Sequence, residues 1–407
     1  VSMFWEARPS NQNFANVASY VFNGDMNGDG ASGNDLIYIP RDRSEMNFVP
    51  FTTGGRSYSV AEQEAAFEAY IQQDPRSRVA CEVLCKENIL ILAGEITSRG
   101  SVDLDAVARR AIRAIGYTDP AMPFNADGVT IHQFVSRQSP EIAQGVDPDR
   151  GLDTDQGAGD QGIMFGYATD ESPELMPLPI LLAHRLARGL AEDRRKAPYT
   201  WLRPDGKTQV SVRYENDRPV ALTDVVVSPQ HSASIAREEI VAYVTGSLAP
   251  RILGDWFSKD IRFHVNPTGS FVLGGPSADA GVTGRKIIVD TYGGAGRHGG
   301  GAFSGKDPSK VDRSGAYFCR YIARQLIGQK LARKAEIQIS YAIGISKPLS
   351  VKVDTFGTGD DAAAAEFIQN MDFRPAAIIE RFDLLRPIYC QTTNYGHFGK
   401  PGLPWEQ

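Results

Sequence analysis

The sequence predicts an α/β (α+β) protein whose sheets are covered on one face by helices and which begins with an irregular segment. With 407 residues, of which 42% are hydrophobic, the chain is long enough to bury the cores of about two to three domains. From about residue 76 onward, helical patterns alternate with β-branched runs, which favours sheets packed against helices. Before about residue 72, Asn, Asp, Gly, Ser and aromatic residues dominate, which is typical of turns and short extended stretches.

The individual elements follow from hydrophobic periodicity and from end signals. Helices are expected at residues 103–115, 180–195, 235–244 and 308–332. Strands are expected at residues 88–94, 209–214, 224–228, 286–290 and 336–343. Asp307 is a suitable N-cap for the helix at 308–332, with Pro308 at its favoured first position.

Composition argues against several classes of protein. The formal net charge of -6 gives no basic surface for a nucleic-acid backbone. No run approaches the roughly 18 apolar residues of a membrane helix, and no signal segment opens the chain. Four cysteines are too few and too scattered for a disulfide framework. We therefore expect reduced, largely buried thiols and a cytoplasmic protein without nucleic-acid or membrane partners.

The N-terminal segment carries one chemical pattern, Asp25-Met-Asn-Gly-Asp-Gly30. Oxygen ligands at every second position followed by Gly form the first half of a calcium loop. Leu36 stands where the closing carboxylate is wanted, so a plain Gly/Asn turn is the alternative. Residues 20–30 and 34–40 also resemble the tail of a TonB-dependent outer-membrane receptor.

The most informative stretch runs from Lys286 to Arg313. Seven glycines lie between Gly293 and Gly305, and a predicted helix follows. Glycines and a helix N-terminus suit a bound anion. Six cations gather here: Arg285, Lys286, Arg297, Lys306, Lys310 and Arg313. The segment therefore predicts a polyphosphate site, with a flexible loop of solvated charges as the alternative.

A P-loop is a second alternative, because Gly300 and Gly305-Lys306 have its spacing. A P-loop needs Ser or Thr after the lysine to hold magnesium. Asp307 stands there instead, so the pattern argues against this class.

Carboxylates extend the predicted site. Asp312 lies inside the cationic segment and is the best magnesium candidate, since magnesium prefers oxygen ligands. Asp279, Asp160 and Glu95 occupy loops or a strand end, where a fold usually presents its chemistry. Each alone is typical of a turn, but together they predict a substrate site. The six histidines show no catalytic spacing.

Two segments carry a specific resemblance. They resemble the two signature segments of the methionine adenosyltransferase family and lie at residues 157–168 (GAGDQGIMFGYA) and 299–313 (GGGAFSGKDPSKVDR). The likeness covers residues 73–407. It implies three α/β domains under pseudo-threefold symmetry, in a homodimer with shared active sites that often pairs into a homotetramer. The expected divisions are residues 1–72, 73–150 with a gating loop from 138 to 149, 151–272 and 273–407.

The resemblance also implies an activity: ATP and L-methionine form S-adenosylmethionine, and the released tripolyphosphate is hydrolysed to phosphate and diphosphate. The methionine sulfur needs no base, so catalysis depends on positioning and on stabilising the leaving phosphates. The catalytic cations would be Lys306, Arg285 and Lys286. ATP would contact Asp205, Lys207, Ser270, Phe271, Asp279, Arg285, Lys286, Ala302 and Lys306. Methionine would contact Glu95, Gln138, Asp160, Asp279 and Lys310. Asp312 would bind Mg²⁺ and Glu82 would bind K⁺.

Two departures from the family pattern are visible. Ser270 stands where the family more often has a basic residue before Phe271. The family's His-Pro-Asp-Lys motif, which supplies a catalytic His and a magnesium-binding Asp, does not occur in the sequence. The alternative function is therefore a nucleotide-binding but catalytically inactive fusion.

Overall fold

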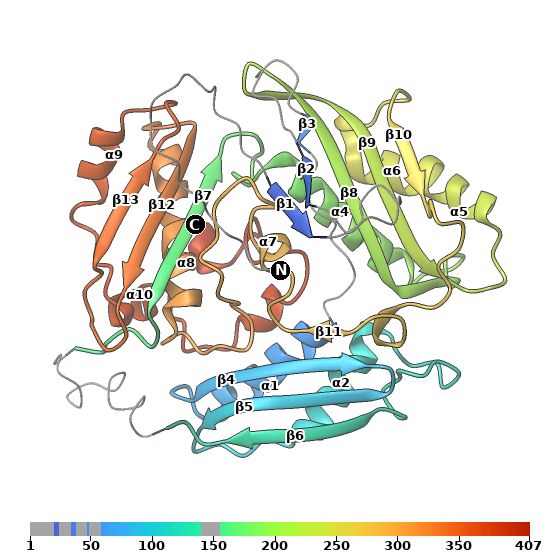
Figure 1. The fold of residues 1–407 in the computed structure, drawn as a ribbon, viewed down its shortest axis with the longest axis horizontal. Coiled ribbons are helices and arrows are strands. Elements are labelled where there is room, and N and C mark those ends of the chain that lie inside the picture. The colour runs from blue at the N-terminus through green and yellow to red at the C-terminus, as the bar shows by residue number, and fades with distance from the viewer. Residues whose placement is uncertain (1–19, 24–33, 38–46, 49–57, 140–154) are drawn as a thin grey trace.

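Three larger sheets lie around a common centre, and each is accompanied by its own helices (Figure 1). The computed structural model describes residues 20–23, 34–37, 47–48, 58–139 and 155–407. This arrangement confirms the expected α/β fold and is consistent with three domains. The candidate calcium loop and most of the expected gating loop fall outside the described residues.

The first sheet has the strand order β11-β4-β5-β6. Its strands are β4 (Arg78–Lys86), β5 (Ile89–Thr97), β6 (Thr130–Ser136) and β11 (Gly281–Val282). Helices α1 (Tyr58–Gln73) and α2 (Leu104–Ile115) pack against each other beside it. The Asp103 carboxylate caps α2 by accepting a hydrogen bond from the Ala106 amide at 3.0 Å.

The second sheet has the order β10-β9-β8-β3. Its strands are β3 (Asn47–Phe48), β8 (Leu202–Glu215), β9 (Arg218–His231) and β10 (Arg262–Val265). Its helices are α4 (Leu178–Asp193), α5 (Arg237–Tyr243), the π-helical turn η1 (Val244–Leu248) and α6 (Ala249–Leu253). Helix α4 packs on β8 and buries a leucine-rich face in a core separate from the main one.

A pair of short strands, β1 (Tyr20–Asn23) and β2 (Asn34–Ile37), forms a separate antiparallel ladder.

The third sheet has the order β13-β12-β7. Its strands are β7 (Gly162–Thr169), β12 (Lys334–Tyr341) and β13 (Ser350–Asp354), and its helices are α8 (Val311–Gly328), α9 (Asp361–Ile368) and α10 (Pro375–Phe382). Helix α8 lies across β7 and β12. A Cβ atom on Gly166 of β7 would lie 2.1 Å from the backbone of Arg320, so glycine permits this close contact.

Sheet membership does not follow the order of the chain. Strand β7 lies before β8 in sequence but pairs antiparallel with β12, more than 150 residues later. Strand β11 likewise pairs antiparallel with β4, matching Gly281 with Cys85. These two crossings join segments that are remote in the sequence, so the sheets interlock.

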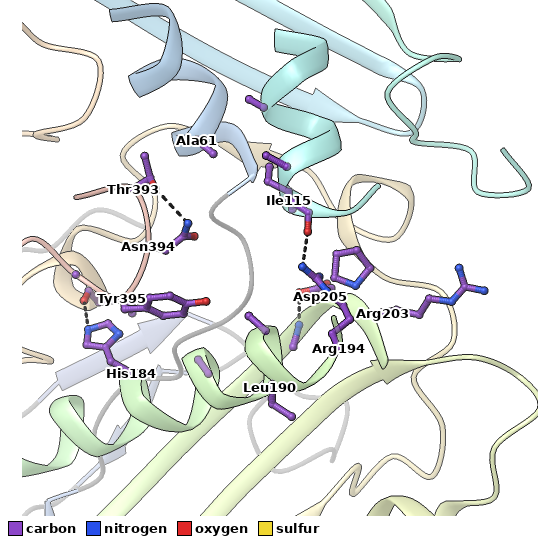
Figure 2. Close-up of a pocket in the computed structure, with 18 of the residues that line it drawn as sticks. Ala61, Ile115, His184, Leu190, Arg194, Arg203, Asp205, Thr393, Asn394 and Tyr395 are labelled. Atoms are coloured by element: carbon purple, nitrogen blue, oxygen red, sulfur yellow. Dashed lines mark hydrogen bonds between the residues drawn. The ribbon is translucent and has the colours of Figure 1, made fainter. Parts of the chain in front are cut away.

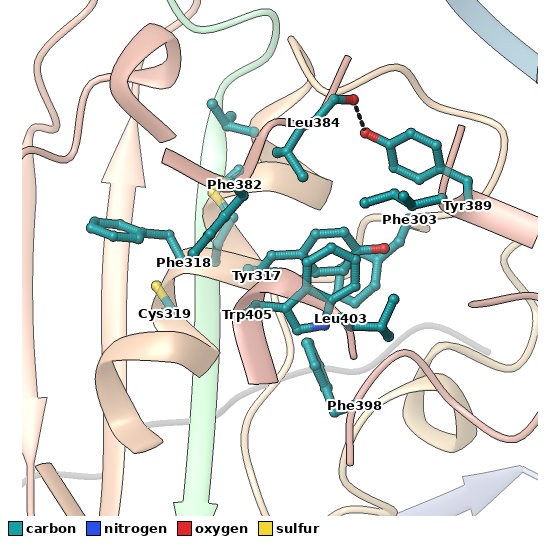
Figure 3. Close-up of a cluster of buried hydrophobic side chains, with 14 of the residues drawn as sticks. Phe303, Tyr317, Phe318, Cys319, Phe382, Leu384, Tyr389, Phe398, Leu403 and Trp405 are labelled. Atoms are coloured by element: carbon teal, nitrogen blue, oxygen red, sulfur yellow. Dashed lines mark hydrogen bonds between the residues drawn. The ribbon is translucent and has the colours of Figure 1, made fainter. Parts of the chain in front are cut away.

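The largest core cluster lies around α8 and the C-terminal segment. Figure 3 shows Tyr317 of α8 stacked on Trp405, with Phe303 and Phe398 beside them. The Tyr317 and Trp405 ring centroids are 3.7 Å apart. The Trp405 indole donates a hydrogen bond to the His397 carbonyl at 3.0 Å. The aromatic cluster thus fixes the last residues against the helix that follows the glycine-rich segment.

Several expectations about local structure are confirmed. The helices expected at 103–115, 180–195 and 235–244 correspond to α2, α4 and α5, and the strands expected at 88–94, 209–214, 224–228 and 336–343 correspond to β5, β8, β9 and β12. All four cysteines are free thiols, although Cys390 is exposed. Within the described residues, no helix combines the length and the apolar character needed to cross a membrane.

Three local expectations are wrong. Residues 286–290 are not a strand; they form the short helix α7 (Ile287–Asp290), because a brief apolar run does not distinguish the two states. Helix α8 begins at Val311 and not at 308, and Lys310, not Asp307, is its N-cap. Residues 58–72, expected to be irregular, form most of α1.

Candidate active site

Lys306 lies at the edge of the first sheet. Its backbone forms an antiparallel bridge with Ala80 of β4, and the Cys81 amide donates to the Gly305 carbonyl at 3.0 Å. On the other side of Ala80 lies Glu95 of β5. Residues directly opposite one another in a sheet share a face. Lys306 and Glu95 therefore flank Ala80 on the face that carries no helices.

Glu82 and Gln138 join this face from neighbouring positions. Glu82 lies two residues after Ala80 on β4 and so points the same way. Desolvation raises the pKa of the Glu82 carboxyl, while the nearby Lys306 ammonium opposes that rise. Gln138 follows β6, and its amide donates to Thr97 at 3.3 Å.

Asp312 lies in the first turn of α8, opposite Lys306. The Lys306 Nζ atom is 2.5 Å from the Asp312 Oδ2 atom, and both side chains are largely buried. A Cβ atom on Gly301 would lie 2.3 Å from the Asp312 carboxylate, so glycine lets the backbone reach this group. His298 lines the same small hollow as Asp312. Burial lowers the pKa of His298 to about 4, so its ring is neutral at neutral pH.

Asp307 holds the segment between Lys306 and α8 in place. Its buried carboxylate accepts hydrogen bonds from the Val79 amide at 2.8 Å and from the Ser309 amide at 3.0 Å. Lys310 forms a close ion pair with the same carboxylate. Burial alone would raise the pKa of Asp307, but Lys310 and Arg78 outweigh it and lower the pKa. Asp307 is therefore a structural anchor in the position where a P-loop would carry a hydroxyl.

The loop that contains Asp160 lies beside Lys310. The Gly159 amide donates to the Ser309 carbonyl at 3.0 Å. A Cβ atom on Gly159 would lie 2.6 Å from that oxygen, so the contact requires glycine. The structure therefore brings the loop of Asp160 close to the segment of Ser309 and Lys310, while their contact with methionine stays a prediction.

Arg285 and Lys286 reach the site through β11. Thr283, two residues before Arg285, accepts a hydrogen bond from the Val83 amide of β4 at 3.0 Å. A Cβ atom on Gly284 would lie 3.0 Å from the Ala302 Cβ atom. Arg285 is exposed and Lys286 is half-buried. The cations therefore follow a segment that runs alongside both β4 and the glycine-rich loop.

A second group of expected site residues lies on the second sheet. The Lys207 ammonium is 5.9 Å from the centre of the Phe271 ring. The Phe271 amide donates to the His231 Nε2 atom at 3.0 Å, and Ser270 next to it is exposed. Buried Asp205 accepts a hydrogen bond from the Gly275 amide at 2.8 Å. Asp205 thereby holds the turn that leads to exposed Asp279.

A cavity of about 390 Å³ lies between α1, α2, α4 and the segment after residue 389. Figure 2 shows that Asp205 and Arg194 lie on one side of it and that Tyr395 and His184 lie on the other. The His184 Nε2 atom donates to the Val289 carbonyl at 3.1 Å. Lys286 also lines this cavity, which therefore adjoins the segment that carries the expected catalytic cations.

Sequence reasoning missed Gln63 and Glu64 of α1. Both side chains are fully buried and contact the glycine-rich segment or its neighbours. The available signal was the apolar spacing of Ala66, Phe67 and Ile71, which face the core and mark a helix. Turn-forming residues upstream obscured that pattern.

Comparisons with known proteins agree with this geometry. Three domain models of one family match in sequence order: S-adenosylmethionine synthetase N-terminal domain at residues 59–140, central domain at 155–271 and C-terminal domain at 273–407. The first match begins at residue 59, so α1 falls within it. The expected likeness to a receptor fragment is therefore wrong for residues 59–72, and it stays a prediction for residues 1–58.

Two relatives match most of the chain. An S-adenosylmethionine synthase of Sorangium cellulosum is 51% identical over 361 residues, covering 87% of this chain and 86% of the relative. An S-adenosylmethionine synthase of Akkermansia muciniphila is 49% identical over 353 residues, covering 84% of this chain and 90% of the relative. With three domain models and two relatives at about half identity, the chain belongs to the S-adenosylmethionine synthetase family, whose members are methionine adenosyltransferases.

Proposed function

We propose that this chain synthesises S-adenosylmethionine from ATP and L-methionine and hydrolyses the tripolyphosphate to phosphate and diphosphate. The observation that supports the proposal is the Lys306–Asp312 ion pair beside the first sheet, where Lys306 lies on one side of Ala80 and Glu95 on the other. Cations and carboxylates alternate there around a glycine-rich segment. Membership of the family supports the same reaction.

The reaction needs positioning more than acid or base chemistry. The methionine sulfur lone pair attacks C5′ of ATP, the C5′–O bond breaks, and its electrons move onto the triphosphate. Lys306, Arg285 and Lys286 would stabilise that growing negative charge. Because the sulfur is already nucleophilic, the site must mainly align it with C5′.

The remaining assignments follow the two groups of residues. We assign the nucleotide to Asp205, Lys207, Ser270, Phe271, Asp279 and Ala302 together with the three cations. Buried Asp205 would act mainly through the turn that carries Asp279. We assign methionine to Glu95, Gln138, Asp160, Asp279 and Lys310. The division of the chain into domains that begin at residues 73, 151 and 273 also remains part of the proposal.

Asp312 fits a magnesium ion that is held mostly by phosphate oxygens. Magnesium usually takes one or two protein carboxylates and fills its other positions with water and substrate. The Asp312 side chain is 13% exposed and lies against Gly301 and the Lys306 ammonium. When bound, Mg²⁺ would neutralise charge on the triphosphate. We assign K⁺ to Glu82, whose carboxylate lies on the same face.

We propose a homodimer that pairs into a homotetramer, because large apolar side chains are exposed on a sheet and in loops. Phe134 of β6, opposite Ala93 of β5, is 64% exposed, and the loop residues Leu349 and Leu273 are 66% and 61% exposed. Such surfaces mark protein interfaces. The family resemblance implies active sites shared between the two copies, so the Lys207–Phe271 group of one copy would complete the Lys306 group of the other. The four free thiols suit the cytoplasm, where thiols stay reduced.

The test is product formation by the purified chain with ATP, Mg²⁺ and K⁺, with and without methionine. Methionine-dependent S-adenosylmethionine, with phosphate and diphosphate, is the expected result. ATP binding without product would support the inactive fusion, which the names of the relatives do not support. Phosphate release that ignores methionine would contradict the proposal.

A further inference from the structure

We infer that Gln63 and Glu64, two consecutive residues of α1, are positioning residues that hold the two cationic segments of the site in register. This inference rests on the proposed function, because it concerns the binding of the triphosphate chain. Both side chains are fully buried. They act through Arg313 and Thr283.

Glu64 anchors Arg313, the residue after Asp312. Two nitrogens of the Arg313 guanidinium donate to the two Glu64 carboxylate oxygens, at 2.5 Å and 3.1 Å. The same guanidinium donates to the Lys306 backbone carbonyl at 3.0 Å. One arginine thus joins α1 to the residue whose ammonium would meet the phosphates. A bidentate pair of this kind fixes orientation as well as distance.

The Arg313 guanidinium has further restraints. It lies over the Tyr389 ring at 4.1 Å and donates to the Tyr317 hydroxyl at 3.0 Å. That hydroxyl in turn contacts the His397 Nδ1 atom at 2.7 Å. Burial lowers the preference of the guanidinium for its charged form, but Glu64 outweighs this and raises the pKa of Arg313. Removing the Glu64 charge would leave a buried cation without its counter-ion.

Gln63 anchors the other cationic segment. The Thr283 hydroxyl donates to the Gln63 Oε1 atom at 3.1 Å, and the Gln63 Nε2 atom donates to the Cys81 carbonyl of β4 in a close contact. Thr283 lies two residues before Arg285. A Cβ atom on Gly305 would clash with Gln63, so this side chain also touches the residue before Lys306.

Two adjacent side chains therefore connect three segments: β4, the approach to Arg285, and the glycine-rich loop with Lys306. The cations of these segments must meet one phosphate chain at the same time. A displacement of about 1 Å in a catalytic arrangement can cost on the order of 10²-fold in rate. The register of the cations is thus set by α1, a helix that contributes no group to the substrate.

The experiment uses the full chain, with inorganic tripolyphosphate as the probe. Its dissociation constant is measured by calorimetry with Mg²⁺, and the kcat and KM values for S-adenosylmethionine formation are measured beside it. The variants are Glu64→Gln, Glu64→Asp and Thr283→Val, which loses the hydroxyl that contacts both Gln63 and the Val83 amide. Glu68→Gln is the matched control, since Glu68 lies one turn along α1 and contacts the Cys390 amide instead.

We expect tripolyphosphate to bind roughly tenfold more weakly to Glu64→Gln and about threefold more weakly to Thr283→Val. Each loss of binding free energy is a small fraction of the strength of a bidentate ion pair. The kcat value should fall while the KM value for methionine stays nearly constant. Glu64→Asp, which keeps the charge, should recover most of the binding, and Glu68→Gln should match the unaltered chain.

Folded Glu64→Gln and Thr283→Val variants with unaltered tripolyphosphate binding and kcat would overturn the inference. If Glu64→Gln does not fold, Thr283→Val and Glu64→Asp decide the question. Lys306→Ala separates this inference from the proposed function. Tripolyphosphate binding that Lys306→Ala leaves unchanged would overturn the site itself, and the inference with it.

Discussion

Replacing Glu62 with methionine should stabilise the protein. Glu62 lies on the buried face of α1, and neither of its carboxylate oxygens has a hydrogen-bond partner among the described residues. Burial raises its pKa well above the usual value. An unsatisfied buried polar group costs about 1–3 kcal/mol, and methionine has a similar shape and a good helix propensity.

We therefore expect Glu62→Met to gain about 2–4 kcal/mol at pH 8 from its two unsatisfied oxygens. For a cooperative unit of 150–250 residues this corresponds to a rise in Tm of roughly 4–16 °C. Because the folded-state pKa of Glu62 is raised, its contribution to stability is fully present below the unfolded pKa of about 4.3 and is lost as pH rises through the folded pKa. The gain should thus be larger at pH 8 than at pH 5.

Thermal unfolding at both pH values, with the exposed Gln72→Met as control, tests this reasoning. A Glu62→Met variant that is no more stable than the control at pH 8 would refute the view of Glu62 as an unsatisfied buried acid. A gain of equal size at both pH values would refute the part that concerns its ionisation.

Three further predictions concern the site, the interface and a loop anchor. Lys306→Ala should lower kcat for S-adenosylmethionine formation by about 10²–10³, the usual effect of removing one group that stabilises transition-state charge, and a normal rate would contradict its role. Phe134→Asp should place a charge on the helix-free face and shift the sedimentation coefficient toward the monomer; an unchanged value would place the interface elsewhere. Asp74→Asn should destabilise the chain by about 1–2 kcal/mol at pH 7, because Asp74 accepts hydrogen bonds from the Arg99 amide and guanidinium. Arg99 lowers the pKa of Asp74 to about 2, so this stabilisation is present above the unfolded pKa and is lost as pH falls through about 2. A difference in urea midpoint between the unaltered chain and Asp74→Asn that stayed constant from pH 4 to pH 2 would argue against this role.

Short-range patterns predicted much of the fold. Helix α2 follows from Asp103, a regular apolar stripe and Gly116, all of which act within a few residues. The same applies to α4 and to strands β5, β8, β9 and β12. The cationic glycine-rich segment and Asp312 were also recognisable, because their chemistry lies within one continuous stretch of sequence.

Patterns failed where a distant partner decided the outcome. Asp307 resembles a helix cap, but its carboxylate bonds to Val79, 228 residues earlier, and to Lys310. The apolar run after Lys286 pairs with no strand among the described residues and forms α7. A side chain with two competing roles takes the one that its buried surroundings satisfy.

The sequence by itself determined the family, the class of fold and the residue types that can meet a triphosphate. Only the tertiary structure decided that β11 and the glycine-rich loop lie along β4, and that Gln63 and Glu64 join them. The physical reason is that local periodicity reports which face of an element is apolar, whereas strand pairing and buried ion pairs depend on segments that are about 200 residues apart.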